Sequence, residues 1–226
     1  DTAWSDVSLD DAQDSLHNVE KAKTKLEAAK KTLQADGVQF PIHLDLPVSS
    51  TQTDFVRQAQ SYKQSIEEAL GVENVVVDIQ QVSDDELGSM TVLATSKDNI
   101  DWDINPNSGW SPDYADPSTY LDAFDPTSGP TLLGALGIAP GSDSSAIKAV
   151  GLDKYKELLD DANSEKTDLE KRYSKYAKAQ AWLTDSALII PVNSDGAQML
   201  VTKKVPGTGA DGWVGDKTGD RKSTRL

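Results

Sequence analysis

The spacing of apolar residues along the first third of the chain changes between two periods, which predicts alternating helices and strands. Apolar side chains recur every three or four positions over 18–36 and 53–70, as in amphipathic helices, and a glycine follows each run. Apolar and polar residues then alternate over 42–46 and 75–79, which predicts strands. This order favours an α/β fold with a largely parallel or mixed sheet flanked by helices.

Further elements are expected downstream of these four. Ser83 should cap a short helix, and the alternation in 99–104 predicts another strand. Helical spacing returns over 151–162. A capping box, formed by Thr167 and the glutamate three residues later, predicts a second helix that runs into a buried strand over 187–192.

Two stretches lack a regular pattern. Residues 125–145 are rich in Gly, Pro, Ser and Asp, and we expect an irregular surface insertion there. Repeated glycines in 206–226 predict a flexible tail. The chain is therefore expected to form a single α/β lobe, residues 1–205, followed by this tail.

The segment 109–121 carries its own helix start signal. It reads Gly-Trp-Ser-Pro-Asp-Tyr-Ala-Asp-Pro-Ser-Thr-Tyr-Leu. Asp116 is a favourable N-cap and Pro117 suits the first helical position, so a short helix is expected to begin there. The apolar face of this helix would consist of Tyr120, Leu121 and Phe124.

Asp113 lies in the turn before that helix, between Trp110 and Tyr114. The strand expected upstream, this turn and the helix start would together form the rim of a cleft. Asp and Pro are also ordinary turn residues, and Trp and Tyr can simply fill a core. On the residues alone, a ligand-binding rim and a structural turn are both open.

Two stretches resemble a known family. Residues 109–121 are similar to the signature G-W-x-x-D-Y-x-D-P-x-x-(Y/F)-L of bacterial extracellular solute-binding proteins of the oligopeptide-binding family, which deliver peptides to ATP-driven importers. The Ala-Gln-Ala-Trp-Leu run at 179–183, followed by Ile-Ile-Pro-Val at 189–192, resembles the same family. The resemblance implies one lobe of a type II periplasmic-binding-protein-like fold, without the family's first lobe.

The resemblance also implies which residues bind the ligand. In the family, the aspartate at the position of Asp113 binds the α-ammonium of the peptide, and the tryptophan at the position of Trp110 lines a side-chain pocket. Tyr114, Ser111 and Asn105 are weaker candidates. The chemistry is suitable because a carboxylate only accepts hydrogen bonds, and a charge-assisted bond to an ammonium contributes about 1.5–3 kcal/mol.

Composition narrows the possible partners. The net charge of −15 makes nucleic acid and anionic lipid surfaces poor partners. The chain has no cysteine, which excludes disulfides, thiolate metal sites and cysteine nucleophiles. It has no run of about 18 apolar residues, so no membrane-spanning segment is expected.

Motifs for cofactors and metals fail on their context. The Gly-x-Gly-x-x-Gly match at 207–212 follows a proline and precedes more glycines, so it does not open a dinucleotide-binding helix. Residues 101–112 begin like a calcium loop but have proline at the sixth and twelfth positions. His17 and His43 lack the partners of a metal or catalytic site. We expect no cofactor, no metal and no enzymatic activity.

The favoured hypothesis is therefore the ligand-binding lobe of an oligopeptide receptor. Its expected partners are oligopeptides, the missing N-terminal lobe of the same protein and the membrane permease of an ABC importer, and a monomer is expected. The expected location is the extracellular face of a bacterial cell, with a lipid anchor at an N-terminus that this chain lacks. A cell-surface adhesion domain, binding of a non-peptide solute, and an acid–base enzyme using Asp113 and Asp116 remain as alternatives.

Overall fold

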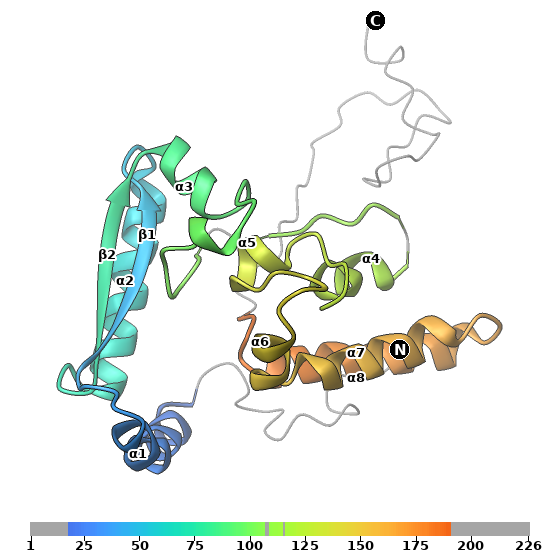
Figure 1. Ribbon diagram of the computed structural model, residues 1–226, viewed down its shortest axis with the longest axis horizontal. Helices are drawn as coiled ribbons and strands as arrows, with labels where there is room; N and C mark the ends of the chain where they lie inside the picture. Colours follow the sequence, from blue (N-terminus) through green and yellow to red (C-terminus); the bar gives the residue numbers. More distant parts are fainter. Residues whose placement is uncertain (1–17, 107–108, 115, 191–226) are drawn as a thin grey trace, which may run out of the picture.

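The computed structural model describes residues 18–106, 109–114 and 116–190, and all the elements named here lie in these ranges. In chain order they are α1 (Val19–Ala35), β1 (Ile42–Ser49), α2 (Thr53–Leu70), β2 (Val75–Val82), α3 (Asp84–Met90), η2 (Lys97–Asn99), α4 (Ser118–Leu121), η3 (Asp122–Phe124), α5 (Leu132–Leu136), α6 (Ser144–Ala149), α7 (Leu152–Ser164) and α8 (Leu169–Asp185), where η denotes a 3-10 helix. Figure 1 shows the sheet with α2 at one end of the molecule and α7 with α8 at the other.

The two predicted strands pair in parallel, with Ile42 opposite Val75 and Ser49 opposite Val82. Since paired residues of parallel strands share a face, the apolar positions of both strands meet on one side of the sheet. There Leu46 and Val77 pack with Ala59 of α2 in a fully buried cluster. The predicted strand–helix–strand order is thus confirmed, and the sheet of the described residues is parallel.

A second core lies among the helices. Tyr155 of α7 and Tyr176 of α8 are buried in it, together with Leu121 of α4. The Tyr155 hydroxyl donates to the carbonyl oxygen of Leu121 at 2.7 Å, which fixes α4 against α7. The predicted helix over 151–162 is confirmed as the larger part of α7. Within the described part of the chain, no helix is both long and apolar enough to cross a bilayer.

The strand predicted over 99–104 is wrong. The side-chain oxygen of Asn99 accepts from the backbone N–H groups of Thr95 and Ser96, which closes a turn around η2. Such local bonds compete with a strand ladder. At the end of this segment the N–H groups of residues 103 and 104 donate to the carbonyl oxygen of Asp45 at 2.9 and 3.0 Å. The Asp103 carboxylate accepts from the N–H of Asp45 at 2.8 Å, so the contact with the sheet is limited to one residue of β1.

The irregular insertion expected over 125–145 is wrong at its centre, which forms α5. Leu132 is fully buried there and belongs to the helical core. One of the glycines that predicted a loop serves close packing instead: a Cβ on Gly134 would lie 2.6 Å from the carbonyl oxygen of Thr91. Glycine permits that backbone approach because it has no side chain.

Two expectations at the ends of α8 are also wrong. The N-cap is Asp168, whose side chain accepts from the N–H of Lys171 at 3.0 Å, so the box at Thr167 does not form. At the other end, Ala187 has a positive φ of 57° and the chain turns, so the described residues 187–190 form no strand. Residues 191–192 of this expected strand and the tail expected over 206–226 lie outside the described residues.

Candidate functional site

The candidate loop, residues 109–114, immediately precedes α4 on the surface. Trp110 and Tyr114 are 36% and 49% exposed, and Asp113 is exposed between them. Ser111 is exposed as well. Large aromatic side chains left in solvent beside a carboxylate are typical of a surface that contacts a ligand.

Three hydrogen bonds tie this loop to the first turn of α4. The Trp110 indole N–H donates to the carbonyl oxygen of Thr119 at 2.7 Å, and the backbone N–H of Asp113 donates to the Thr119 hydroxyl at 2.8 Å. The hydroxyls of Tyr114 and Ser118 bond at 3.1 Å. Ser118 and Thr119 are themselves buried, so the loop rests on fixed partners.

The side chain and the backbone of Asp113 differ in their hydrogen bonding. Within the described residues the carboxylate forms no hydrogen bond or ion pair, whereas the N–H of Asp113 is held in place. Among the described residues the carboxylate is therefore an unpaired, acceptor-only group on a loop of fixed position. Such a group is suited to binding an external cation or ammonium.

Asn105 is placed differently from the other candidates. Its side-chain amide donates to the carbonyl oxygen of Gly134 at 2.7 Å, which ties it to α5. Ser111 has no side-chain hydrogen bond to any residue of the described ranges. The structure thus brings Trp110, Asp113 and Tyr114 together beside α4, whereas the Asn105 amide bonds to α5.

Asp116 caps the helix as expected, with one difference in the boundary. Its carboxylate oxygen Oδ1 accepts from the N–H of Ser118 at 3.0 Å, and Pro117 has helical dihedrals although α4 is counted from Ser118. The expected apolar face is wrong at Tyr120, which is 44% exposed. Leu121 is buried. Because α4 has only four residues, it buries one side of a single turn, and Tyr120 lies on the other side.

Arg172 contacts this helix start, a pairing that the sequence pattern does not predict. Its guanidinium donates to both carboxylate oxygens of Asp116, from Nε to Oδ2 at 3.1 Å and from Nη2 to Oδ1 at 3.0 Å. This pairing lowers the pKa of Asp116 from 3.8 to about 2. A carboxylate so strongly ionised cannot act as a general acid near neutral pH, which removes the support for an acid–base pair with Asp113. No local signal links two residues that lie 56 positions apart.

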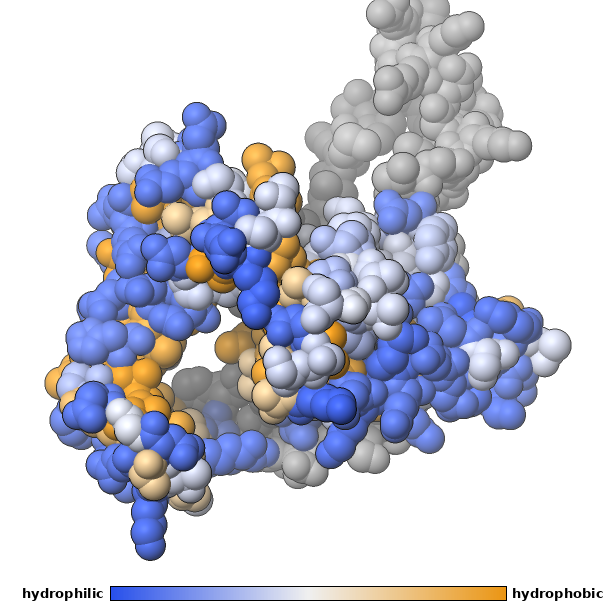
Figure 2. All heavy atoms as spheres, in the orientation of Figure 1, coloured by the Kyte–Doolittle hydropathy of each residue, from blue (hydrophilic) through white to orange (hydrophobic). Residues whose placement is uncertain are grey.

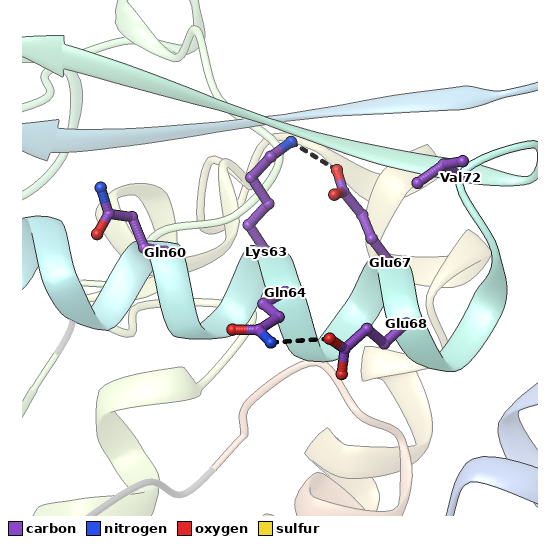
Figure 3. A pocket seen from close by; sticks show the side chains of 6 residues that line it. All are labelled: Gln60, Lys63, Gln64, Glu67, Glu68 and Val72. Carbon is purple, nitrogen blue, oxygen red and sulfur yellow. Dashed lines mark hydrogen bonds and ion pairs between the residues drawn. The ribbon is translucent and has the colours of Figure 1, made fainter.

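A hollow of about 330 Å³ lies on α2, away from the candidate loop. Figure 3 shows Lys63 and Glu67 pointing toward one another on the side of β2. Glu67 accepts from the N–H of Val77 at 3.0 Å, and Lys63 donates to the Val77 carbonyl oxygen at 2.5 Å. These side chains satisfy the outer edge of the sheet, so the hollow is explained by edge protection rather than by a ligand.

The remaining polar clusters give no second site. His43 is exposed on the sheet, with Nδ1 2.6 Å from the Asp78 carboxylate. No group of acidic and histidine side chains in the described ranges could hold a metal ion. His17 and the glycine-rich match at 207–212 lie outside those ranges.

Comparison with known proteins decides the family. The family described as bacterial extracellular solute-binding proteins, family 5 Middle, matches residues 1–131, which include the loop and the first turn of α4. The chain belongs to this family. Its members are solute-binding receptors rather than enzymes, and the resemblance inferred from the loop is confirmed.

Similar curated proteins are oligopeptide-binding proteins of streptococci. SarA of Streptococcus gordonii is 52% identical over 223 residues, which are 99% of this chain and 33% of SarA. AliA of Streptococcus pneumoniae is 52% identical over 205 residues, 91% of this chain and 31% of AliA. AmiA of the same species is 49% identical over 218 residues, 96% of this chain and 33% of AmiA. The chain therefore spans about a third of the length of these relatives.

Solved structures agree on the fold. The peptide-binding protein of a peptide ABC transporter superposes with a TM-score of 0.55 at 24% identity, over 77% of this chain and 65% of that one. The pheromone receptor PrgZ superposes with a TM-score of 0.51 at 22% identity, over 75% of this chain and 27% of PrgZ. The expected fold, one α/β lobe of a type II periplasmic-binding-protein-like architecture, is confirmed.

Proposed function

We propose that the chain is the ligand-binding lobe of an oligopeptide receptor and that Asp113 binds the α-ammonium of the peptide. One observation carries this proposal: Asp113 presents an exposed carboxylate without a partner in the described residues, from a loop whose backbone is fixed. The oligopeptide-binding relatives, at 52% and 49% identity, support the choice of ligand.

The recognition mechanism follows from the chemistry of two groups, the α-ammonium of the peptide and the Asp113 carboxylate. A free N-terminus carries a positive charge and donates hydrogen bonds, and a carboxylate accepts them without offering a competing donor. Because the loop is already fixed by the three bonds to α4, little conformational entropy is lost on binding. The carboxylate thereby selects peptides with an unblocked N-terminus, whatever their sequence.

The neighbouring residues would shape the rest of the site. Trp110 forms the wall of a side-chain pocket, and Tyr114 adds a second aromatic surface beside Asp113. Ser111 and Asn105 supply polar groups at the margins. Extended peptides are usually held through backbone hydrogen bonds and wet pockets, which tolerate many side chains.

The wider assignment rests on the relatives. The lobe would act with a second lobe of the same receptor, as a monomer on the extracellular face of a bacterial cell, held there by a lipid anchor. It would pass peptides to the membrane permease of an ATP-driven importer. No nucleic acid, cofactor or catalytic step enters this function. An adhesion domain that keeps the fold, or a receptor for another solute, is the alternative.

The proposal is tested in a complete receptor. The chain replaces the matching third of SarA, and peptides are titrated calorimetrically into the wild type and into Asp113→Ala. Binding of free-amine peptides should weaken by about tenfold or more in the variant, because a charge-assisted bond is lost. N-acetylation of the peptide should weaken binding to the wild type by a similar factor.

Asp101→Ala is the matched control. Asp101 is exposed, and its side chain has no hydrogen bond or ion pair within the described ranges. This variant should bind as the wild type does. If Asp113→Ala and acetylation both leave the affinity unchanged, Asp113 is not the ammonium anchor. If the wild type binds no peptide at all, the alternatives above become the favoured functions.

A further inference from the structure

Arg172 of α8 holds three segments of the helical core together. Besides its two bonds to the Asp116 carboxylate, Nη1 donates to the carbonyl oxygens of Ala162 and Glu165, at 3.1 and 3.0 Å, where α7 ends. The guanidinium also lies over the ring of Tyr176, 4.8 Å from its centroid. The side chain is only 12% exposed. Its orientation is therefore fixed from several directions.

Asp116 links Arg172 to α4 through hydrogen bonds. Its Oδ1 atom accepts from Arg172 and also from the N–H of Ser118, and its backbone carbonyl accepts from the N–H of Thr119 at 3.1 Å. A helix as short as α4, with four residues, is not stable by its own hydrogen bonds. The direction of its first turn thus depends on what holds Asp116.

The position of the candidate loop depends in turn on the position of α4. Three of its hydrogen bonds go to Ser118 and Thr119, the first two residues of α4. A fourth joins it to Asp116 itself, whose N–H donates to the carbonyl oxygen of Tyr114 at 3.0 Å. A continuous path of bonded groups therefore runs from Arg172, through Asp116 and this first turn, to the backbone of Asp113. Since the carboxylate of Asp113 has no partner of its own in the described residues, the backbone sets the position and direction of its Cα–Cβ bond and so the space that the carboxylate can reach.

We propose that Arg172 is a positioning residue for the ligand, a role that rests on the peptide-binding function proposed above. It orients the Asp113 carboxylate through Asp116 without contacting the peptide. The two parallel bonds to Asp116 need the planar fork of a guanidinium, whereas a lysine offers a single point charge. The conservative substitution Arg172→Lys should therefore fail to preserve the loop.

The first test uses the indole N–H of Trp110 in the 226-residue chain. Nitrogen-15 labelling of tryptophan gives separate indole signals, and Trp110→Phe identifies the one that belongs to the loop. In Arg172→Lys and Arg172→Gln this signal should shift toward the solvent-exposed position, and its hydrogen exchange should become about tenfold faster. The bond to the Thr119 carbonyl is the one that is lost.

Lys175→Gln is the matched control. Lys175 also lies on α8 and also binds α7, donating to the carboxylate and the carbonyl oxygen of Asp161 at 2.7 and 3.2 Å, but it does not touch Asp116. Its removal should leave the Trp110 signal unchanged. Equal changes in both variants would mean that any loosening of the α7–α8 pair moves the loop, and the proposal would be overturned.

The second test separates positioning from general stability in the SarA exchange receptor. Arg172→Lys should weaken binding of free-amine peptides by about fivefold or more and leave N-acetylated peptides unaffected, because only the ammonium uses Asp113. Equal losses for both peptides, or no loss for either, overturn the positioning role. If the wild type binds neither peptide, the proposed function fails, and the Trp110 exchange then decides separately whether Arg172 orients the loop.

Discussion

At the residue scale, one ion pair, between Asp116 and Arg172, lies at the start of the helix that the candidate loop contacts. The Asp116 carboxylate is 25% exposed and the Arg172 side chain 12%, so their bonds are only partly screened by water. A paired arrangement of this kind contributes more than an exposed surface pair, because the geometry is bidentate and further backbone groups share the guanidinium. The same pair anchors the helix start that the loop depends on.

This pair predicts how stability depends on pH. The pKa of Asp116 is about 2 in the folded protein against an ordinary 3.8, so the unfolded chain binds the proton more readily. Its contribution, about 1–2 kcal/mol after solvent screening, is fully present above pH 4 and is lost as the pH falls toward 2. Asp116→Asn should remove that amount at pH 7 and flatten the dependence over this interval, as measured by urea unfolding.

Asp101→Asn serves as the comparison, because its carboxylate has no partner in the described part of the chain. It should unfold like the wild type at every pH. If Asp116→Asn retains the wild-type slope between pH 4 and 2, another carboxylate carries the acid sensitivity. Glu165, whose pKa the N–H groups of Thr167 and Asp168 lower to about 2, is the group to examine next.

At the element scale, the sequence predicts those helices and strands whose formation depends on the pattern of their own apolar residues. The helices α2 and α7 and both strands follow from periodicity, because each buries apolar residues on one face. The helix α1 also follows its predicted period, although none of its residues is buried. The strand expected over 99–104 fails because Asn99 closes a turn with its side chain, an option that periodicity does not reveal. The pairing of Asp116 with Arg172 could not be predicted, because it joins residues 56 positions apart. Asp113 was found only because its neighbours resemble a family signature.

Replacing glycine by alanine should change the stability in opposite directions in α5 and in α3. A Cβ on Gly134 in α5 would meet the Thr91 carbonyl oxygen at 2.6 Å, and backbone cannot move aside as a flexible side chain can. Gly134→Ala should therefore cost about 1–3 kcal/mol. A Cβ on Gly88, inside α3, would meet only Leu93 at 3.5 Å, an ordinary contact. Gly88→Ala should stabilise by about 0.5–1 kcal/mol because alanine favours the helix.

Thermal and urea unfolding of the two variants, side by side, measure this difference. The two changes add the same methyl group, so the comparison isolates the space around each glycine. If Gly134→Ala is neutral, α5 can move away from α3, and the reason given for the helix at 132–136 is wrong.

At the scale of the whole molecule, the described residues form two cores, one under the sheet and one among the helices. The segment 97–105 connects them: Lys97 pairs with Asp143 at 2.6 Å, and the indole N–H of Trp102 donates to the Met90 carbonyl oxygen at 2.7 Å. Figure 2 shows an opening between the two parts and hydrophilic residues over most of the outer surface of the helical part. The candidate loop lies on the helical part, so one part of the lobe carries the proposed anchor.

The chain by itself should bind peptides weakly. The proposed receptor would enclose the ligand between two lobes, and this chain, which spans about a third of the length of its relatives, would supply one wall. Leaving about 150 Å² of apolar ligand surface in water costs about 4 kcal/mol, which corresponds to roughly a thousandfold in affinity. Titration of the same free-amine peptide into the isolated chain and into the SarA exchange receptor measures that ratio. Equal affinities would mean that this lobe carries the complete site, and the opening between its two parts would then be the place to look for the peptide.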